Sequence, residues 1–259
     1  RTQGMAIVLN NFFGTIINTA YGIASQVSIA IQFVSQSILN AMSPQIVKAE
    51  GKKEHQHMLS LAELLCKYSF LLLSLIVIPV SFEITSILNF WLGSTPPATA
   101  EICRFLLITS LVDQTTIGLS TANQATGNIR NFSLTINTIK VMTLLFAYLV
   151  LHLGYGITAA MWCYVGVEAL CALIRLPFLK YSAGLSISKF VRNVFVKIIP
   201  STLCILCISY LCIHFIQSLL GFRFLLTIFL SVVVGVVSIW ITAMNKQERG
   251  TALRIIMNK

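Results

Sequence analysis

The sequence predicts an all-α fold, a bundle of helices that crosses a membrane several times. Hydrophobic residues make up 56% of the 259 residues and charged residues only 10%, which is far more apolar than a soluble domain. The apolar residues form separate runs of about 20 residues, the length that a helix needs to cross the hydrocarbon core. The basic residues behind the net charge of +10 stand between these runs, as in membrane proteins with basic cytoplasmic loops. Nucleic acid is not an expected partner, because no basic patch with interleaved aromatic residues is present.

The first apolar run, residues 5–13, is too short to cross a bilayer. We therefore expect the chain to be the C-terminal part of a longer protein, cut inside a helix. A link over residues 14–20 is expected to precede a spanning helix over about residues 21–42. That helix should stop at Ser43 and Pro44, because proline disfavours helix continuation and charged residues follow.

Polar residues at spacings of 3, 4 and 7 form a stripe along this helix. They are Ser25, Gln32, Ser35, Gln36 and Asn40. Unpaired polar groups are costly in hydrocarbon, so the stripe should face other helices or a hydrated cavity.

The later elements follow the same pattern of apolar runs and basic connectors. Spanning helices are expected over about residues 63–87, 102–125, 132–151, 157–178, 194–216 and 222–243. Because each span crosses the membrane, alternate loops lie on opposite sides of it. Counted in this way, almost all Lys and Arg of the loops lie on one side, for example in residues 48–60, in 180–197 and after 243, whereas Arg223 lies on the other. The basic loops and the C-terminus are therefore predicted to be cytoplasmic.

Several charged residues are expected inside the bilayer, where a charge must be paired, neutralised or hydrated. Asp113 lies mid-way along the fourth span, with Thr116, Ser120 and Asn123 on the same side. It is predicted either to couple transport to a proton or cation, to line a polar cavity, or to make a packing hydrogen bond. Glu168, in the sixth span, is a second candidate for ion coupling.

Three basic residues are also expected within or at the edges of the membrane-spanning segments. Lys140 can either reach water or pair with Asp113 or Glu168, and Arg1 is a candidate for contacting an anionic substrate. Arg175 is expected to extend to the cytoplasmic interface as an anchor. Glu83, Glu101 and Arg104 are expected to form an interfacial charge cluster.

No motif of an enzyme is found: there is no HExxH, GxSxG or P-loop sequence. The chain is therefore not expected to be an enzyme, and neither a metal nor a cofactor is predicted.

Two groups of residues resemble a known family. The segments RTQG, LNNFFG, NTAYGIASQVS and SQSILNAMSPQIVKAEGKKE, with the later ATGNIRNF, look like the middle of bacterial polysaccharide flippases of the O-antigen type. These belong, with the lipid II flippases and the MATE multidrug exporters, to the multidrug-oligosaccharidyl-lipid-polysaccharide superfamily. The resemblance covers Arg1 to about Phe178.

The resemblance implies two six-helix lobes around a central cavity that work by alternating access. This chain would be the C-terminal lobe of such a MATE-like transporter, from a truncated helix seven to helix twelve in residues 1–179. Two additional transmembrane helices in 180–243 and a basic cytoplasmic tail in 244–259 would follow.

Family members move undecaprenyl-pyrophosphate-linked oligosaccharides across the bacterial inner membrane for polysaccharide biosynthesis, driven by a monovalent cation or proton gradient. The implied partners are the lipid-linked oligosaccharide, membrane lipid, and a glycan polymerase and glycosyltransferases. Arg1 and Lys140 would be the cationic partners of the pyrophosphate.

Two alternatives remain open at this stage. A MATE-type cation-coupled multidrug exporter should have a more aromatic and acidic site than the amide- and hydroxyl-rich stripe predicted here. A non-transporting membrane scaffold for glycan assembly predicts no accessible cavity behind Gln32, Gln36 and Asp113.

Overall fold

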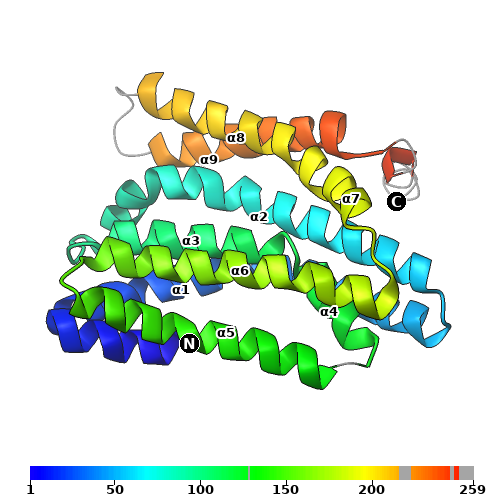
Figure 1. The fold of residues 1–259 in the computed structure, drawn as a ribbon. Helices are drawn as coiled ribbons and strands as arrows, with labels where there is room; N and C mark the ends of the chain where they lie inside the picture. The colour runs from blue at the N-terminus through cyan, green and yellow to red at the C-terminus, as the bar shows by residue number, and fades with distance from the viewer. Residues whose placement is uncertain (128, 216–222, 246–247, 251–259) are drawn as a thin grey trace.

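The computed structural model describes residues 1–127, 129–215, 223–245 and 248–250, and every regular element within them is a helix. The helices are α1 (Thr2–Gly51), α2 (His55–Leu92), α3 (Thr99–Gln114), α4 (Ile117–Ala125), α5 (Ile129–His152), α6 (Ile157–Ala183), α7 (Ile187–Phe190), α8 (Val196–Phe215) and α9 (Arg223–Ser238) (Figure 1). Short π-helical segments follow α7 (Val191–Phe195) and α9 (Ile239–Ala243). The predicted all-α class is confirmed, whereas most of the predicted tail lies outside the described residues.

By length and composition, 6 helices in the described part of the chain are able to cross a membrane. The consecutive helices α3 and α4 would add one more if they form a single bent span, for a total of up to 7. This arrangement indicates a multi-pass membrane protein. The division at residues 179 and 243 remains a prediction.

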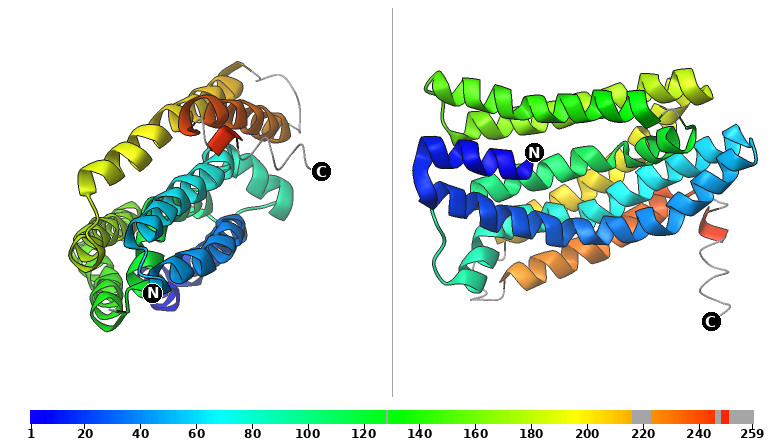
Figure 2. Two further views of the ribbon diagram at one scale, coloured as in Figure 1. Left: turned by 90° about the vertical axis from the view of Figure 1, so that its right-hand side faces the viewer. Right: turned by 90° about the horizontal axis from the view of Figure 1, so that it is seen from below.

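Helix α2 is the centre of the bundle. It packs against α1, α3 and α4 on one side and against α8 and α9 on the other (Figures 1 and 2). The α8–α9 pair forms a separate layer, and the end-on view in Figure 2 shows α2 between this layer and the remaining helices. The polar pocket described below lies on the side of α2 opposite to the α8–α9 layer, between α1, α3, α5 and α6.

Helix α1 differs from its prediction at both ends. The expected link over residues 14–20 is a break at the single residue Gly14, with φ 75° and ψ −171°, a backbone conformation that is essentially restricted to glycine. The helix also continues through Pro44 to Gly51 instead of stopping there. Beyond the proline, Ile46 and Ala49 are buried in a core with residues of α2, and this burial compensates for the cost of a proline inside a helix.

The connectors are shorter than hydropathy suggested. The expected basic loop over residues 48–60 reduces to a tight turn at residues 52–54, in which the backbone N–H of Glu54 donates to the Ala49 carbonyl at 3.0 Å. The expected connector over 180–197 is largely helical, with its break at residues 184–186. A helix can continue beyond the hydrocarbon core into water, where charged residues are tolerated. The apolar runs therefore mark the part of each helix that lies in the hydrocarbon core, and not the residues at which the helix begins and ends.

Candidate functional site

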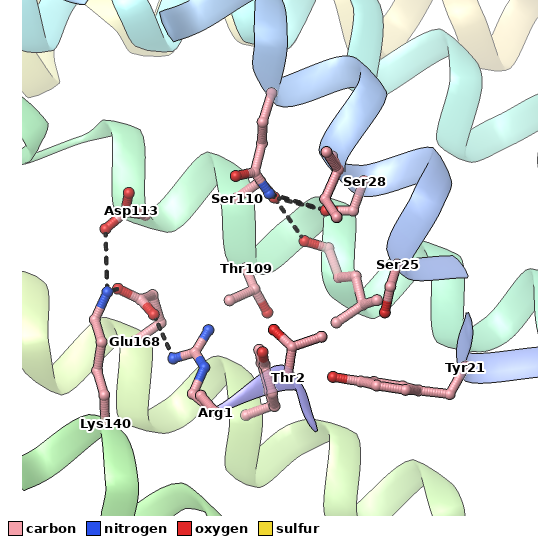
Figure 3. Close-up of a pocket in the computed structure, with 14 residues that line it drawn as sticks. Arg1, Thr2, Tyr21, Ser25, Ser28, Thr109, Ser110, Asp113, Lys140 and Glu168 are labelled. Atoms are coloured by element: carbon pink, nitrogen blue, oxygen red, sulfur yellow. Dashed lines mark hydrogen bonds and ion pairs between the residues drawn. The ribbon is translucent and has the colours of Figure 1, made fainter. Parts of the chain in front are cut away.

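A cavity of about 260 Å³ lies between α1, α3, α5 and α6 (Figure 3). We call it the central pocket. Its lining residues are Arg1, Thr2, Tyr21, Ser25, Ser28, Ile29, Gln32, Leu106, Thr109, Ser110, Asp113, Lys140, Tyr164 and Glu168. Four helices thus contribute polar side chains to one cavity, an arrangement that isolated packing hydrogen bonds do not require.

One end of the pocket is charged. The Glu168 side chain is 1% exposed. Its Oε2 accepts a hydrogen bond from Arg1 Nη1 at 2.6 Å, and its Oε1 forms an ion pair with Lys140 Nζ at 3.0 Å. Lys140 Nζ also lies 3.8 Å from Asp113 Oδ1, so the lysine stands between the two carboxylates (Figure 3). The predicted pairing of Lys140 with Asp113 and Glu168 is therefore present in the structure.

Arg175 completes this charged network from behind the pocket. Its Nη2 lies 2.7 Å from Asp113 Oδ1 and 3.7 Å from Glu168 Oε1, and its side chain is 3% exposed. The expectation that Arg175 extends to the interface is wrong, because its seven-residue separation from Glu168 places it on the same face of α6, directed at Asp113. Three cationic and two anionic side chains then leave one positive charge in excess, which favours an anionic ligand.

The other end of the pocket is lined by hydroxyl and amide groups. Gln32 Nε2 donates to Ser28 Oγ at 2.9 Å and to Ser110 Oγ at 2.7 Å, which ties α1 to α3. The Tyr21 hydroxyl and Ser25 Oγ are buried without a hydrogen-bond partner among the described residues. Buried hydroxyls are normally paired, so these two groups are available to a ligand or to water.

Two tyrosines also line the pocket. The Arg1 guanidinium lies over the Tyr164 ring, 3.8 Å from its centroid, and Tyr21 points its hydroxyl toward Thr2 (Figure 3). This stacking holds Arg1 in place while its Nη1 pairs with Glu168.

Six of the predicted site residues line the central pocket: Arg1, Ser25, Gln32, Asp113, Lys140 and Glu168. Gln36 and Asn40 do not, because both are exposed on the outside of α1. Each step of four residues advances a side chain by about 40° around a helix, so the polar stripe turns away from the pocket beyond Gln32. The prediction extended the stripe too far.

The predicted residues of the fourth span beyond Asp113 lie outside the pocket. The chain bends by 47° between α3 and α4, so Thr116, Ser120 and Asn123 leave the line of Asp113. Thr116 accepts a hydrogen bond from Arg175 Nη1 at 3.1 Å, whereas Asn123 Nδ2 donates to the Leu119 carbonyl at 3.1 Å. Ser120 is half-buried on α4.

The predicted interfacial cluster is not formed. Glu83 is 1% exposed and pairs with Arg223, whose Nε lies 2.9 Å from Glu83 Oε1. Glu101 instead accepts a hydrogen bond from Thr158, and Arg104 donates to the Ser81 carbonyl. The three had been grouped because all were expected near the outer face of the membrane.

Sequence reasoning missed Tyr21 and Ser28 as site residues. Ser28 precedes Gln32 by one helical turn, so the inward face of α1 could have been centred on this pair had the stripe been fitted from its N-terminal half. Nothing in the local sequence identifies Tyr21, because its position in the pocket depends on where α6 places Tyr164.

Fold and site together define a helical, multi-pass membrane protein with a charged polar pocket inside the bundle. No family model, curated protein or solved structure matches the chain. Among the described residues, no group of His, Cys, Asp and Glu is arranged to hold a metal ion.

Proposed function

We propose that the chain carries the substrate pocket of a flippase that moves a lipid-linked oligosaccharide, with an undecaprenyl-pyrophosphate carrier, across the bacterial inner membrane by alternating access. The observation that supports this proposal is the central pocket, with a net cationic end beside a hydroxyl- and amide-lined end. The sequence resemblance points to the same class.

The two ends of the pocket match the two polar parts of such a substrate. Arg1 and Lys140 at the charged end are partners for a pyrophosphate, because cationic groups form the strong hydrogen bonds to phosphate oxygens. Gln32, Ser25 and the Tyr21 hydroxyl at the other end are partners for sugar hydroxyls. Pockets for drug-sized ligands measure about 300–1,000 Å³, so a cavity of about 260 Å³ accommodates only the linkage region and leaves the lipid tail outside.

The position of Lys140 between two acids supports coupling to a cation or proton gradient. A cation that binds Asp113 or Glu168 weakens the hold of that acid on Lys140, and a pyrophosphate that binds Lys140 leaves each acid with one positive partner fewer. Binding of one ligand therefore changes the charge that the other meets, which is the requirement for coupled transport.

The alternatives fit the pocket less well. An organic-cation exporter would present unpaired acids, whereas both acids here are paired with Lys or Arg. A scaffold requires no polar cavity behind Gln32 and Asp113, yet both residues line one.

A matched pair of variants on α1 tests the proposal. In the full-length protein, Gln32→Leu should lower glycan export at least tenfold, because it removes the amide that faces the pocket. Gln36→Leu should leave export unchanged, because that side chain is exposed outside the pocket. The measurement is surface glycan in a flippase-deficient bacterial strain, with membrane insertion checked by immunoblot.

Equal export by wild type and Gln32→Leu would exclude the pocket as the substrate path. Efflux of organic cations without glycan export would favour the exporter. Normal export with an inaccessible pocket, shown by failure to label a cysteine introduced at Gln32, would favour the scaffold.

A further inference from the structure

The central pocket is adjacent to a broken helix. Between α3 and α4, Thr115 and Thr116 interrupt the helix and the chain bends by 47°. Sharp bends usually occur at proline, at Gly/Ser pairs, at a π-bulge or where a side chain enters the hydrogen-bond ladder. Neither Thr115 nor Thr116 is proline or glycine, so the cause of the bend lies elsewhere in the fold.

A side chain from α6 occupies the break. Arg175 Nη1 lies 3.3 Å from the Asp113 carbonyl and 3.1 Å from Thr116 Oγ1, while Nη2 lies 2.7 Å from Asp113 Oδ1. One guanidinium thus bonds the last turn of α3, a residue of the break itself, and the pocket carboxylate. Only arginine carries several donors in a fixed planar fork, so the three bonds form together.

We propose that Arg175 is the positioning residue of the central pocket, and that it links the charge at Asp113 to the bend between α3 and α4. This inference rests on the proposed function only where it assigns the bend a role in transport. When a cation binds Asp113, or the carboxyl is neutralised, Arg175 loses its strongest bond and its hold on the Asp113 carbonyl and Thr116 loosens with it.

The packing of α4 determines which part of the broken helix responds. A Cβ atom at Gly118 would lie 2.1 Å from the Ala62 carbonyl oxygen, so α4 lies directly against the backbone of α2. Because α4 is held against α2 at this contact, a change in the bend acts on the end of α3 that carries Asp113. Helix α3 carries Thr109, Ser110 and Asp113 along the pocket wall, so its movement changes the shape of the site.

Hydrogen–deuterium exchange of the full-length protein in nanodiscs tests the link directly. Arg175→Gln and Arg175→Met should each speed exchange in peptides covering residues 112–120 at least tenfold. Arg175→Lys should restore at least half of the lost protection on a logarithmic scale, because the amine still pairs with Asp113. Arg104→Gln is the matched control, an exposed arginine on α3 whose loss should leave this segment unchanged.

The partner variant distinguishes positioning from simple packing. Asp113→Asn keeps the shape of the side chain and should speed exchange at the break at least threefold. The double variant with Arg175→Met should exchange no faster than Arg175→Met alone, which is less than the product of the two single effects. If Arg175→Met does not insert, Asp113→Asn and Arg175→Lys provide the test by themselves. Wild-type protection in Asp113→Asn, or additive effects in the double variant, would overturn the inference.

The hydrogen–deuterium exchange experiment and the glycan export assay test different proposals, so either proposal can be rejected without the other. Faster exchange at residues 112–120 together with no glycan export by the wild type would retain the link and reject the flippase. Unchanged exchange together with normal export would retain the flippase and reject the link.

Discussion

At the scale of single residues, Lys140 makes longer ion pairs than the two arginines of the charged network. Its Nζ lies 3.0 Å from Glu168 Oε1 and 3.8 Å from Asp113 Oδ1, and its side chain is 28% exposed. Arg1 and Arg175 are each fixed by shorter contacts, at 2.6 Å to Glu168 and 2.7 Å to Asp113. Lys140 is therefore the cation that is freest to change partner during a transport cycle.

A double-mutant cycle tests the coupling between Lys140 and Asp113. Lys140→Met and Asp113→Asn should each lower export tenfold or more, because each strands a charge in a low-dielectric site. The Asp113→Asn, Lys140→Met double variant should be less impaired than the product of the single effects. The charge swap Asp113→Lys, Lys140→Asp should recover part of the activity.

Glycan export measured for all four proteins gives the coupling energy. Lys189→Met, an exposed lysine in α7, is the matched control for loss of a positive charge and should be silent. Purely additive defects across the cycle would mean that the two side chains act independently.

Sequence patterns identified the charged residues of the pocket but not which of them pair with one another. A charge in the middle of an apolar run is visible in any sequence, so Asp113, Lys140 and Glu168 were found. Arg175 was misassigned because its position along α6 allowed it to extend toward water. Its inward direction follows from the break in the neighbouring helix, a tertiary feature that periodicity does not report.

At the scale of helices, the breaks are the features that matter for the site. The break at Gly14 turns the first segment of α1 back, so that Arg1 and Thr2 reach the same cavity as Tyr21 and Gln32. Hydropathy located the spans because burial in lipid selects apolar runs. It did not find the break between α3 and α4, because Thr115 and Thr116 carry none of the usual signals for one.

A pair of glycine variants on α1 tests the break at Gly14. Gly14→Ala should destabilise the protein by about 1–3 kcal/mol, because φ 75° with ψ −171° is strained for any side chain. Gly22→Ala should be neutral or stabilise by up to about 1 kcal/mol, because Gly22 lies within regular helix. No heavy atom lies within 4 Å of a Cβ built at either position, so only the backbone distinguishes them.

Unfolding in detergent, followed by circular dichroism, measures both glycine variants. Equal stability of the two would show that the chain reversal near Gly14 does not depend on glycine at that position.

At the scale of the whole molecule, α2 holds the α8–α9 layer through ion pairs at two levels. Glu83 pairs with Arg223 at the start of α9, and Lys67 pairs with Glu248 beyond its end, with Nζ to Oε1 at 2.6 Å. The polarity is reversed between the two pairs, since α2 supplies the acid in one and the base in the other. The layer can therefore dock on α2 in one orientation only.

Topology is the first whole-molecule prediction. Reporter fusions after Gly51 and at the C-terminus should both report a cytoplasmic location, and a fusion at Thr95 should report the opposite side, because basic segments remain cytoplasmic. Figure 1 shows the α1–α2 turn and the C-terminal end of α9 at the same end of the bundle, with the α2–α3 turn at the other. Phosphatase and fluorescent-protein fusions measure this, and a C-terminus opposite to Gly51 would reject the arrangement.

The attachment of the C-terminal residues to α2 gives a pH prediction. Burial alone would raise the pKa of Glu248, but hydrogen bonds from Lys67 and from the Asn245 backbone N–H outweigh it and hold the pKa below its ordinary value. A carboxyl whose pKa is depressed in the folded state stabilises that state above the unfolded pKa, about 4.3 for glutamate. This stabilisation is lost as the pH falls through the lower, folded pKa.

The wild type should therefore lose on the order of 1 kcal/mol of stability on acidification below about pH 4.3, through this one ion pair. Glu248→Gln should be less stable at pH 7 and should approach the wild type as the pH falls, because protonation removes the same interaction. Glu54→Gln, at an exposed glutamate in the α1–α2 turn that makes no ion pair in the described part of the chain, should be as stable as the wild type at pH 7 and is the control. Thermal unfolding of the three proteins across this pH range measures the difference, and a constant gap between wild type and Glu248→Gln at every pH would contradict the assignment.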